Sequence, residues 1–314
     1  MTTIVKRFAA KYKIWLLCLL TALVMAVIRP AFATVSNIEG ILSSMMAYGV
    51  AALGLTVSLI GGEINIAIGS IVAFSGVVFA RFIPDIGLFP ALLLSLALCL
   101  VLGMLDGYFV AYKRLPAFLV AVVFLISVRG LALWVSSSQP ILITDETFKA
   151  ISSFRVGPIP GCFFLFLLLV VLVEIFLKYT QMGRNLYATG GNAEAAKAAG
   201  LNVQFYKFFG LMFSSLMAGL GGIFLTTRLS SAVPSVGEDA VMTVMPIIVM
   251  GGTSLNGGKG SAVWTLSGAL LMYLIFNVMS MFNIYVNVQS IIKGVIVLGI
   301  VVIDKFFANR NKKV

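Results

Sequence analysis

The sequence predicts an all-α membrane protein with about ten transmembrane helices. Of its 314 residues, 61% are hydrophobic and only 11% are charged, whereas soluble domains average about half apolar and about a quarter charged residues. A membrane-spanning helix needs about 20 apolar residues, so ten of them would take up roughly 200 positions. We therefore expect residues 1–314 to form a single transmembrane domain.

Ten apolar segments are candidates for the spanning helices, and the eighth is unusually short. Along the chain they are residues 14–28, 38–60, 64–79, 88–112, 117–135, 162–177, 205–225, 240–252, 262–281 and 288–303. The first segment has an alternative interpretation, because the basic residues before it and Ala31-Phe32-Ala33 after it also match a cleavable signal peptide. We prefer a retained first helix.

Lysine and arginine positions predict the orientation of these helices. Fifteen of them fall in segments on the side of the membrane that would hold both termini. Five fall in segments on the other side: Arg29, Arg81, Lys149, Arg155 and Arg228. Since basic residues concentrate in cytoplasmic loops, both termini are predicted to be cytoplasmic and the number of spans to be even.

Two polar connections are long enough to have functions of their own. Residues 136–161 form a predicted external loop, either a plain connector or a landing surface for an external partner. Residues 178–206 form the largest predicted cytoplasmic loop, where Asn192 can cap a short helix, Glu194 lies in its first turn and Gly200 can end it. The residues between them are mostly alanine, so this helix can dock closely into a groove on another protein. The alternative is a capped loop helix without a partner.

Two glycine-rich breaks interrupt the apolar segments, one in each half of the chain. They read GGEINIAIGS at 61–70 and GGTSLNGGKGS at 251–261. Irregular backbone at membrane depth needs protein or water to satisfy its amides, and a pair of such breaks indicates a transport pathway. The alternative is two tight cytoplasmic turns. Glu63, Asn65 and Ser70 are candidate pathway residues, since hydroxyl-rich solutes need a few placed polar groups; otherwise they cap the helix break.

Few ionisable residues lie deep inside the predicted spans, where such groups need a wet or paired interior. Asp106 is expected to neutralise basic residues near the cytoplasmic face, and Glu174 and Lys293 are expected near the cytoplasmic ends of their helices. Arg129 is the most deeply placed cation, and the sequence names no partner for it. Buried acids are therefore scarce, which argues against a carrier driven by protons or sodium ions.

Several function classes are disfavoured by what the sequence lacks. It holds no histidine, and Cys18, Cys99 and Cys162 are far apart, so we expect no metal site, no disulfide framework and no cofactor. No nucleophile–base set can be assembled from the spans, which argues against an enzyme. The net charge of +11 reflects basic cytoplasmic loops rather than nucleic-acid binding. No Walker-type phosphate-binding motif occurs, so any energy from ATP must come from another chain.

Three stretches resemble the permease subunits of bacterial ABC importers of the ribose and simple-sugar family. Residues 63–70 are similar to the family's G-I-D-L-S-V-G-S, and residues 251–261 to its G-G-T-S-L-x-G-G-x-G. Residues 188–203, ATGGNAEAAKAAGLNV, are similar to A-L-G-G-N-x-x-A-A, running on to G-I-N-V. The chain departs from the first pattern at Glu63, Asn65 and Ala67, where the family has Gly, Asp and Ser. If this segment lines the pathway, the shifted negative charge changes the solute preference.

The resemblance implies a cobalamin-importer-like permease fold in the bacterial cytoplasmic (inner) membrane. It implies a homo- or heterodimer with a second permease subunit, two cytoplasmic ATP-binding-cassette ATPase subunits and an external or periplasmic solute-binding protein. The alanine-rich helix would then be the coupling helix that docks on an ATPase. The residues expected to take part in ATPase coupling are Gly190, Gly191, Asn192, Glu194, Ala195, Ala196 and Gly200.

We therefore predict a non-catalytic permease subunit that moves a sugar or sugar-like small polar solute into the cell by alternating access. The alternative is a secondary carrier or channel for a small solute that works without an ATPase. The coupling loop and the scarcity of buried acids favour the importer. In that case, Ala196→Arg is expected to leave the protein folded and to uncouple transport.

Overall fold

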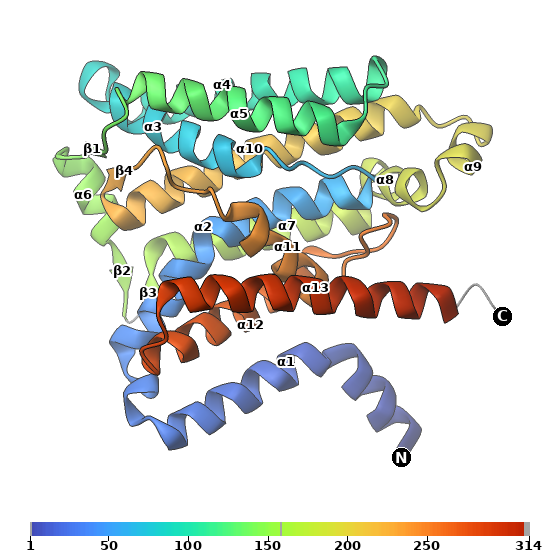
Figure 1. Cartoon of the computed structure of the whole chain (residues 1–314), viewed down its shortest axis with the longest axis horizontal. Helices are drawn as coiled ribbons and strands as arrows, with labels where there is room; N and C mark the ends of the chain where they lie inside the picture. The colour runs from blue at the N-terminus through green and yellow to red at the C-terminus, as the bar shows by residue number, and fades with distance from the viewer. Residues whose placement is uncertain (1, 158, 311–314) are drawn as a thin grey trace.

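The computed structural model describes the backbone of residues 2–157 and 159–310, and the side chains of residues 14–299 apart from 151, 158 and 297. Among the described residues, the regular secondary structure is helical except for four strands of two residues each. Most of the longer helices run side by side along the long axis of the molecule (Figure 1). In chain order the elements are α1 (Thr2–Ile28), η1 (Pro30–Ala33), α2 (Val35–Ile60), α3 (Ile68–Ile86), α4 (Leu88–Gly107), η2 (Tyr108–Tyr112), α5 (Ala117–Val135), β1 (Ile141–Leu142), α6 (Glu146–Ser153), β2 (Arg155–Val156), β3 (Ile159–Pro160), α7 (Gly161–Tyr179), α8 (Gln181–Gly191), α9 (Ala193–Ala198), α10 (Val203–Leu229), β4 (Ser231–Ala232), α11 (Ala240–Gly251), α12 (Ala262–Met281) and α13 (Val286–Arg310).

Seven helices in the described part of the chain are long and apolar enough to cross a membrane. They are Val35–Ile60, Ile68–Ile86, Leu88–Tyr112, Ala117–Val135, Gly161–Tyr179, Val203–Leu229 and Ala262–Met281. Three shorter apolar helical segments, Ile14–Ile28, Ala240–Gly251 and Val286–Ile296, fall at the other predicted positions. The prediction of a helical, multi-pass membrane protein is confirmed.

Two local predictions need correction. The third segment, predicted at 64–79, is helical only from Ile68 and continues to Ile86. The helix begins late because the Asn65 side chain accepts a hydrogen bond from the Ala67 backbone N–H at 3.0 Å, a local turn that competes with helix formation. The 178–206 loop holds two helices, α8 and α9, where the sequence predicted only the second.

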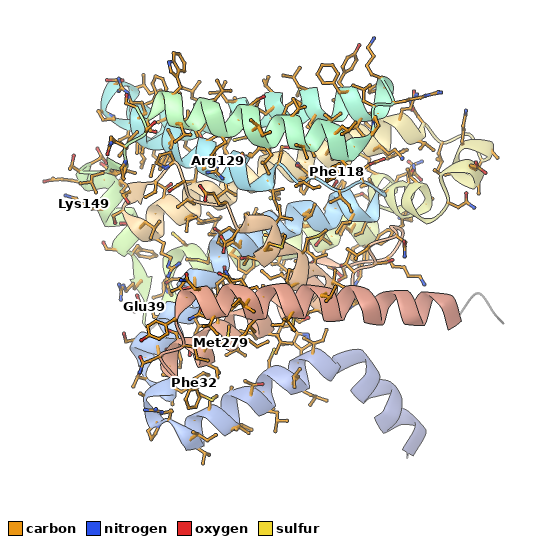
Figure 2. The ribbon with its side chains drawn as sticks, in the orientation of Figure 1. Phe32, Glu39, Phe118, Arg129, Lys149 and Met279 are labelled. Carbon is orange, nitrogen blue, oxygen red and sulfur yellow. The ribbon has the colours of Figure 1, made fainter. Side chains whose placement is uncertain are left out.

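The centre of the bundle is formed by α2, α3 and α10, which are largely buried, whereas α4, α5 and α7 lie at the periphery. Small residues allow the central helices to approach closely, as at many helix crossings in membranes. A methyl group added at Gly222 of α10 would lie 2.1 Å from the Val72 carbonyl oxygen of α3. The peripheral helices instead expose large apolar side chains such as Leu93, Phe118 and Leu172 (Phe118 is labelled in Figure 2), which suits contact with lipid tails.

The two ends of the bundle differ in structure. One end, called the loop end, carries α6 and the two small antiparallel sheets, β1–β4 and β2–β3 (Figure 1). Lys149 projects there from α6 (Figure 2). The opposite end, called the α9 end, carries α8 and α9, and there α1 begins and α13 ends (Figure 1). The predicted external segment 136–161 and the predicted cytoplasmic segment 178–206 therefore lie at opposite ends.

Candidate functional site

The three glycine-containing stretches meet at the α9 end, although they lie far apart in the sequence. The Gly258 backbone N–H donates a hydrogen bond to the Ile60 carbonyl oxygen at 3.1 Å. A methyl group added at Gly190 would lie only 1.9 Å from that same oxygen. Gly257 and Gly258, which lie against Gly190 and Gly191, have φ angles of +83° and +68° that favour glycine. We call this contact of backbone on backbone the glycine junction.

Helix α9 begins directly after the glycine junction. Its two ends are formed as the sequence predicted. The Asn192 side chain accepts a hydrogen bond from the Ala195 backbone N–H at 3.0 Å, the pattern of an N-cap. Gly200 follows the helix with φ of +83°, and the Gly200 and Leu201 N–H groups return to carbonyls of the helix at 3.0 Å each.

The alanines of α9 divide into two faces. Ala196 is only 5% exposed and faces the rest of the protein. Ala195, Ala198 and Ala199 are exposed, and their spacing places them together on one side of the helix. Glu194 is also exposed. The outward side of α9 is thus a small, flat alanine surface.

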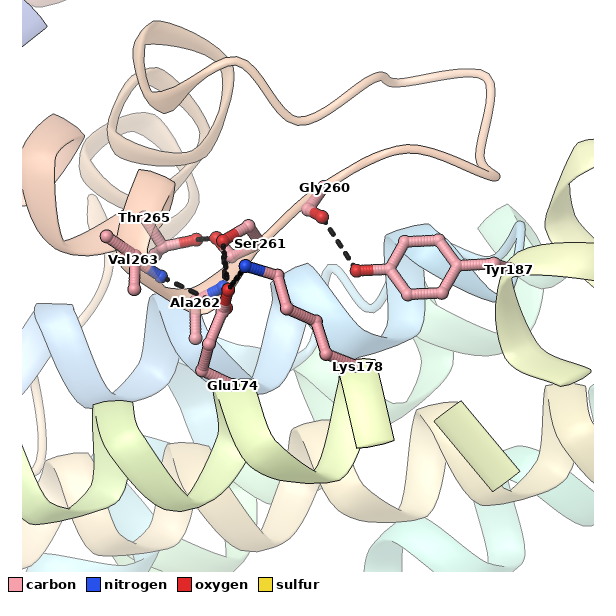
Figure 3. A network of polar contacts seen from close by, with 8 residues as sticks. All are labelled: Glu174, Lys178, Tyr187, Gly260, Ser261, Ala262, Val263 and Thr265. Carbon is pink, nitrogen blue, oxygen red and sulfur yellow. Dashed lines mark hydrogen bonds and ion pairs between the residues drawn. The ribbon is translucent and has the colours of Figure 1, made fainter. Parts of the chain in front are cut away.

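A carboxylate network fastens the 251–261 segment to α7 (Figure 3). Glu174 of α7 accepts hydrogen bonds from the Ser261 hydroxyl at 2.8 Å and from the Ala262 N–H at 2.8 Å, and forms an ion pair with Lys178. A carboxylate suits this position, because the N-terminus of α12 carries partial positive charge. The Glu174 carboxylate therefore fixes the start of α12 against α7.

Tyr187 of α8 adds a second link to the same segment. Its hydroxyl donates to the Gly260 carbonyl oxygen at 2.7 Å (Figure 3). Burial, reinforced by the negative charge of Glu174, raises the pKa of Tyr187 to about 12, so the hydroxyl keeps its proton at neutral pH. Nothing in the local sequence marks this tyrosine, because its partner is a backbone atom 73 residues away.

The three predicted pathway residues hold the break between α2 and α3 in place. Glu63 pairs with Lys207 of α10 at 2.6 Å. Asn65 is fully buried, and its amide donates to the Ser215 hydroxyl of α10 at 3.1 Å. Ser70 is also fully buried and donates to a backbone carbonyl of α5 at 2.6 Å. These contacts tie the break to α5 and α10, and a part of the three residues in solute passage stays a prediction.

Among the described residues, one cavity of several hundred Å³ opens at each end of the bundle. The α9-end cavity, about 650 Å³, lies between α9, the start of α10 and the connection from α4 to α5. Its charged lining residues are Glu63, Arg114, Glu194, Lys197 and Lys207. The loop-end cavity, about 470 Å³, lies between α2, α11, α12 and α13 and the end of α10. Sequence reasoning missed it because its polar residues are scattered over five segments.

The ionisable residues inside the spans have specific surroundings. Arg129 of α5 donates to the backbone carbonyls of Pro234 and Val236 at 2.5 and 2.7 Å. Asp106 does not neutralise basic residues as expected, because it is 2% exposed and neither carboxylate oxygen has a hydrogen-bond partner among the described side chains and backbone. Lys293 pairs with Asp239 at 2.6 Å toward the loop end, so its expected place at a cytoplasmic helix end is wrong under the predicted orientation.

The fold and these contacts define a multi-pass helical membrane protein with a capped, exposed helix at one end and a polar cavity at the other. Residues 37–301 match the family described as the permease component of branched-chain amino acid transport systems. The chain therefore belongs to this family and is a non-catalytic permease component of the ABC-importer type.

Several named transport proteins are similar to this one along nearly the whole chain. The ribose import permease protein RbsC of Haemophilus influenzae is 28% identical over 97% of this chain and 96% of its own length. The same-named protein of Escherichia coli K12 is 30% identical over 90% of this chain and 89% of its own. The L-arabinose transport system permease protein AraH of that strain is 29% identical over 92% and 88%. No solved structure matches the chain. The family membership predicted from the three motifs is confirmed.

Proposed function

We propose that this permease moves a sugar or sugar-like solute into the cell by alternating access, driven by ATP-binding-cassette ATPases on separate chains. Support for the solute class comes from the relatives, which are ribose and L-arabinose permeases similar over most of the chain. In this proposal an external or periplasmic binding protein delivers the solute to the loop end, and a second permease subunit completes the pathway.

One observation carries the proposal: α9, with its exposed alanine face, begins directly after the glycine junction. We assign this face to the ATPase groove, since small side chains allow the closest docking. The junction joins the end of α8, which leads into α9, to the end of α2 through Ile60 and to the connection between α11 and α12 through Gly258. Because these contacts are between backbones, a displacement of α9 is passed to two spanning regions without relying on flexible side chains.

The proposed topology follows from the same arrangement. Ten spans, formed by the seven long helices and the three shorter apolar segments, place both termini and α9 in the cytoplasm of a bacterial cell whose inner membrane the chain crosses. The fold assigned here is that of cobalamin-importer-like permeases. This orientation puts the α9-end cavity on the ATPase side and the loop-end cavity on the side of the binding protein.

The decisive experiment enlarges the alanine face. Ala195→Arg puts a long charged side chain on the exposed face while leaving the backbone hydrogen bond to Asn192 in place. In proteoliposomes with the ATPase and binding protein, uptake of D-ribose or L-arabinose is expected to fall by about tenfold or more, as when a packed interface centre is disrupted. Ala195→Ser keeps the small size and is the matched control.

The readouts separate this role from misfolding and from the alternative function. Ala195→Arg should keep the wild-type melting temperature but lose the ATP hydrolysis that the binding protein stimulates. Ala196→Arg is a weaker test than the sequence suggested, since Ala196 faces inward. Uptake by Ala195→Arg equal to wild type would remove the coupling assignment, and solute transport by the permease without any ATPase would favour a carrier or channel.

A further inference from the structure

The loop-end cavity has the size and construction of a small-molecule site. Its volume of about 470 Å³ lies within the ~300–1,000 Å³ usual for ligand pockets. Five helices contribute to its wall: Tyr48 from α2, Arg228 from α10, Thr243 from α11, Asn277 from α12 and Gln289 from α13. A site shared among so many helices is placed to sense, or to be changed by, their relative movement.

Polar residues follow a helical period on the cavity wall. Ser44 and Tyr48 lie one turn apart on α2, and Asn277 and Ser280 lie about one turn apart on α12. Polar groups on spanning helices are expected to face a protein interior or a water-filled space rather than lipid. Their common direction toward one cavity indicates that this space is kept polar across several helices.

Thr243 gives an independent sign that the cavity accepts a ligand. Its side chain is 2% exposed, and its hydroxyl has no hydrogen-bond partner in the part of the chain that the structure describes. A buried hydroxyl without a partner is unfavourable, because it has given up its hydrogen bonds to water without replacing them. Thr243 lines the cavity while its hydroxyl is closed to solvent, so a solute with hydroxyl groups would satisfy it once the surrounding helices move apart.

The charges of the cavity are largely balanced. Lys293 pairs with Asp239 at 2.6 Å and also lies 5.0 Å from the centroid of the Phe276 ring. The other cation, Arg228, is exposed, where solvent screens its charge. The remaining lining is dominated by hydroxyl and amide groups, which both donate and accept hydrogen bonds, together with aromatic faces. This chemistry fits a neutral polyhydroxylated molecule better than an anion or an aliphatic amino acid.

We propose that the loop-end cavity is a transient binding site for a monosaccharide during its passage, with the Thr243 hydroxyl and the Gln289 amide bonding to its hydroxyl groups. Gln289 already donates to the Ile284 carbonyl oxygen at 2.9 Å, and its amide oxygen is the group assigned to accept from the sugar. The site extends the proposed function and rests on it. Tyr48 and Phe276 supply flat surfaces for the apolar faces of the sugar ring. This places solute recognition away from Glu63, Asn65 and Ser70.

The transport test uses the complete importer in proteoliposomes with D-ribose and L-arabinose as probes. Thr243→Val and Gln289→Leu are each expected to lower initial uptake by about fivefold, and about tenfold or more together, because each removes one hydrogen bond. ATP hydrolysis stimulated by the binding protein should stay near the wild-type rate, since α9 is untouched. Thr21→Val is the control, since Thr21 bonds only to its own helix at Leu17 among the described residues.

A labelling test measures occupancy without transport. In the Cys162→Ser background, Ser280→Cys places a thiol on the cavity wall, while Cys18 and Cys99 are buried. D-ribose or L-arabinose is expected to slow maleimide labelling of this thiol in the purified permease, and L-leucine is not. Protection by L-leucine alone, or by none of the three, would overturn the assignment.

The two proposals fail in different ways. If wild-type importer takes up neither sugar, the proposed function is wrong and the sugar site falls with it. If wild-type importer is active while both variants and their combination transport normally, the cavity assignment alone is wrong.

Discussion

The glycine junction and the loop-end cavity differ in packing, although they lie at the two ends of one helical bundle. At the junction, Gly190 and Gly258 allow two backbone segments to pack in direct contact, so that there is no room for even a methyl group between them. At the cavity, side chains from five helices surround an open volume of about 470 Å³. In the proposed function, the first arrangement transmits movement because it is tight, and the second admits a solute because it is open.

This difference also explains what short motifs can reveal. A close backbone approach requires glycine at fixed positions, so the junction leaves contiguous signatures at 61–62, 190–191 and 257–258. A cavity needs only one or two polar side chains from each helix, and many residue types serve. Its members are therefore not distinguishable from other polar residues of the spans by sequence pattern alone.

The largest expected effect is at Gly190. Gly190→Ala would bring a methyl group to 1.9 Å from the Ile60 carbonyl oxygen, so the backbone must shift. We expect a loss of about 1–3 kcal/mol in the free energy of unfolding, seen as a lower melting temperature in detergent, together with loss of coupled uptake. Gly191→Ala is the matched control, because its methyl group would meet its nearest neighbour at 4.0 Å. Equal melting temperatures for the two variants would show that the junction is not tight.

A smaller effect is expected at Glu174, which bonds to the chain just after the junction glycines Gly257 and Gly258. Glu174→Gln removes the charge that accepts from Ser261 and from the N–H groups at the start of α12, and it weakens the pairing with Lys178. We expect a loss of about 1–2 kcal/mol in unfolding free energy, as for hydrogen bonds to charged groups. Asp85→Asn breaks the exposed Arg81–Asp85 pair and should cost less than about 1 kcal/mol. A similar fall in melting temperature for both variants would contradict a special role for Glu174.

Much of the fold could be predicted because membrane helices must be long and apolar. The predicted segments 117–135 and 262–281 coincide with α5 and α12. The segment at 64–79 was misplaced because the buried Asn65 side chain, which a hydropathy pattern cannot see, forms its own turn. For the site, the cap at Asn192 was local and predictable. The Tyr187–Gly260 and Glu174–Ser261 contacts were not, since they depend on how distant helices pack.

The smallest expected change in stability is at the loop end, and its sign is the most informative. Thr243→Val removes a buried hydroxyl that has no partner among the described residues, so the free energy of unfolding should stay equal or rise by up to about 1 kcal/mol. Thr56→Val, the matched control, removes a buried hydroxyl that lies 2.7 Å from the Thr265 hydroxyl, and it should lower the melting temperature. A variant at Thr243 that gains stability while losing sugar uptake would show that its hydroxyl serves the solute rather than the fold. If Thr243→Val instead loses as much stability as Thr56→Val and keeps normal uptake, the hydroxyl is structural, and the contrast between the two ends does not hold at this residue.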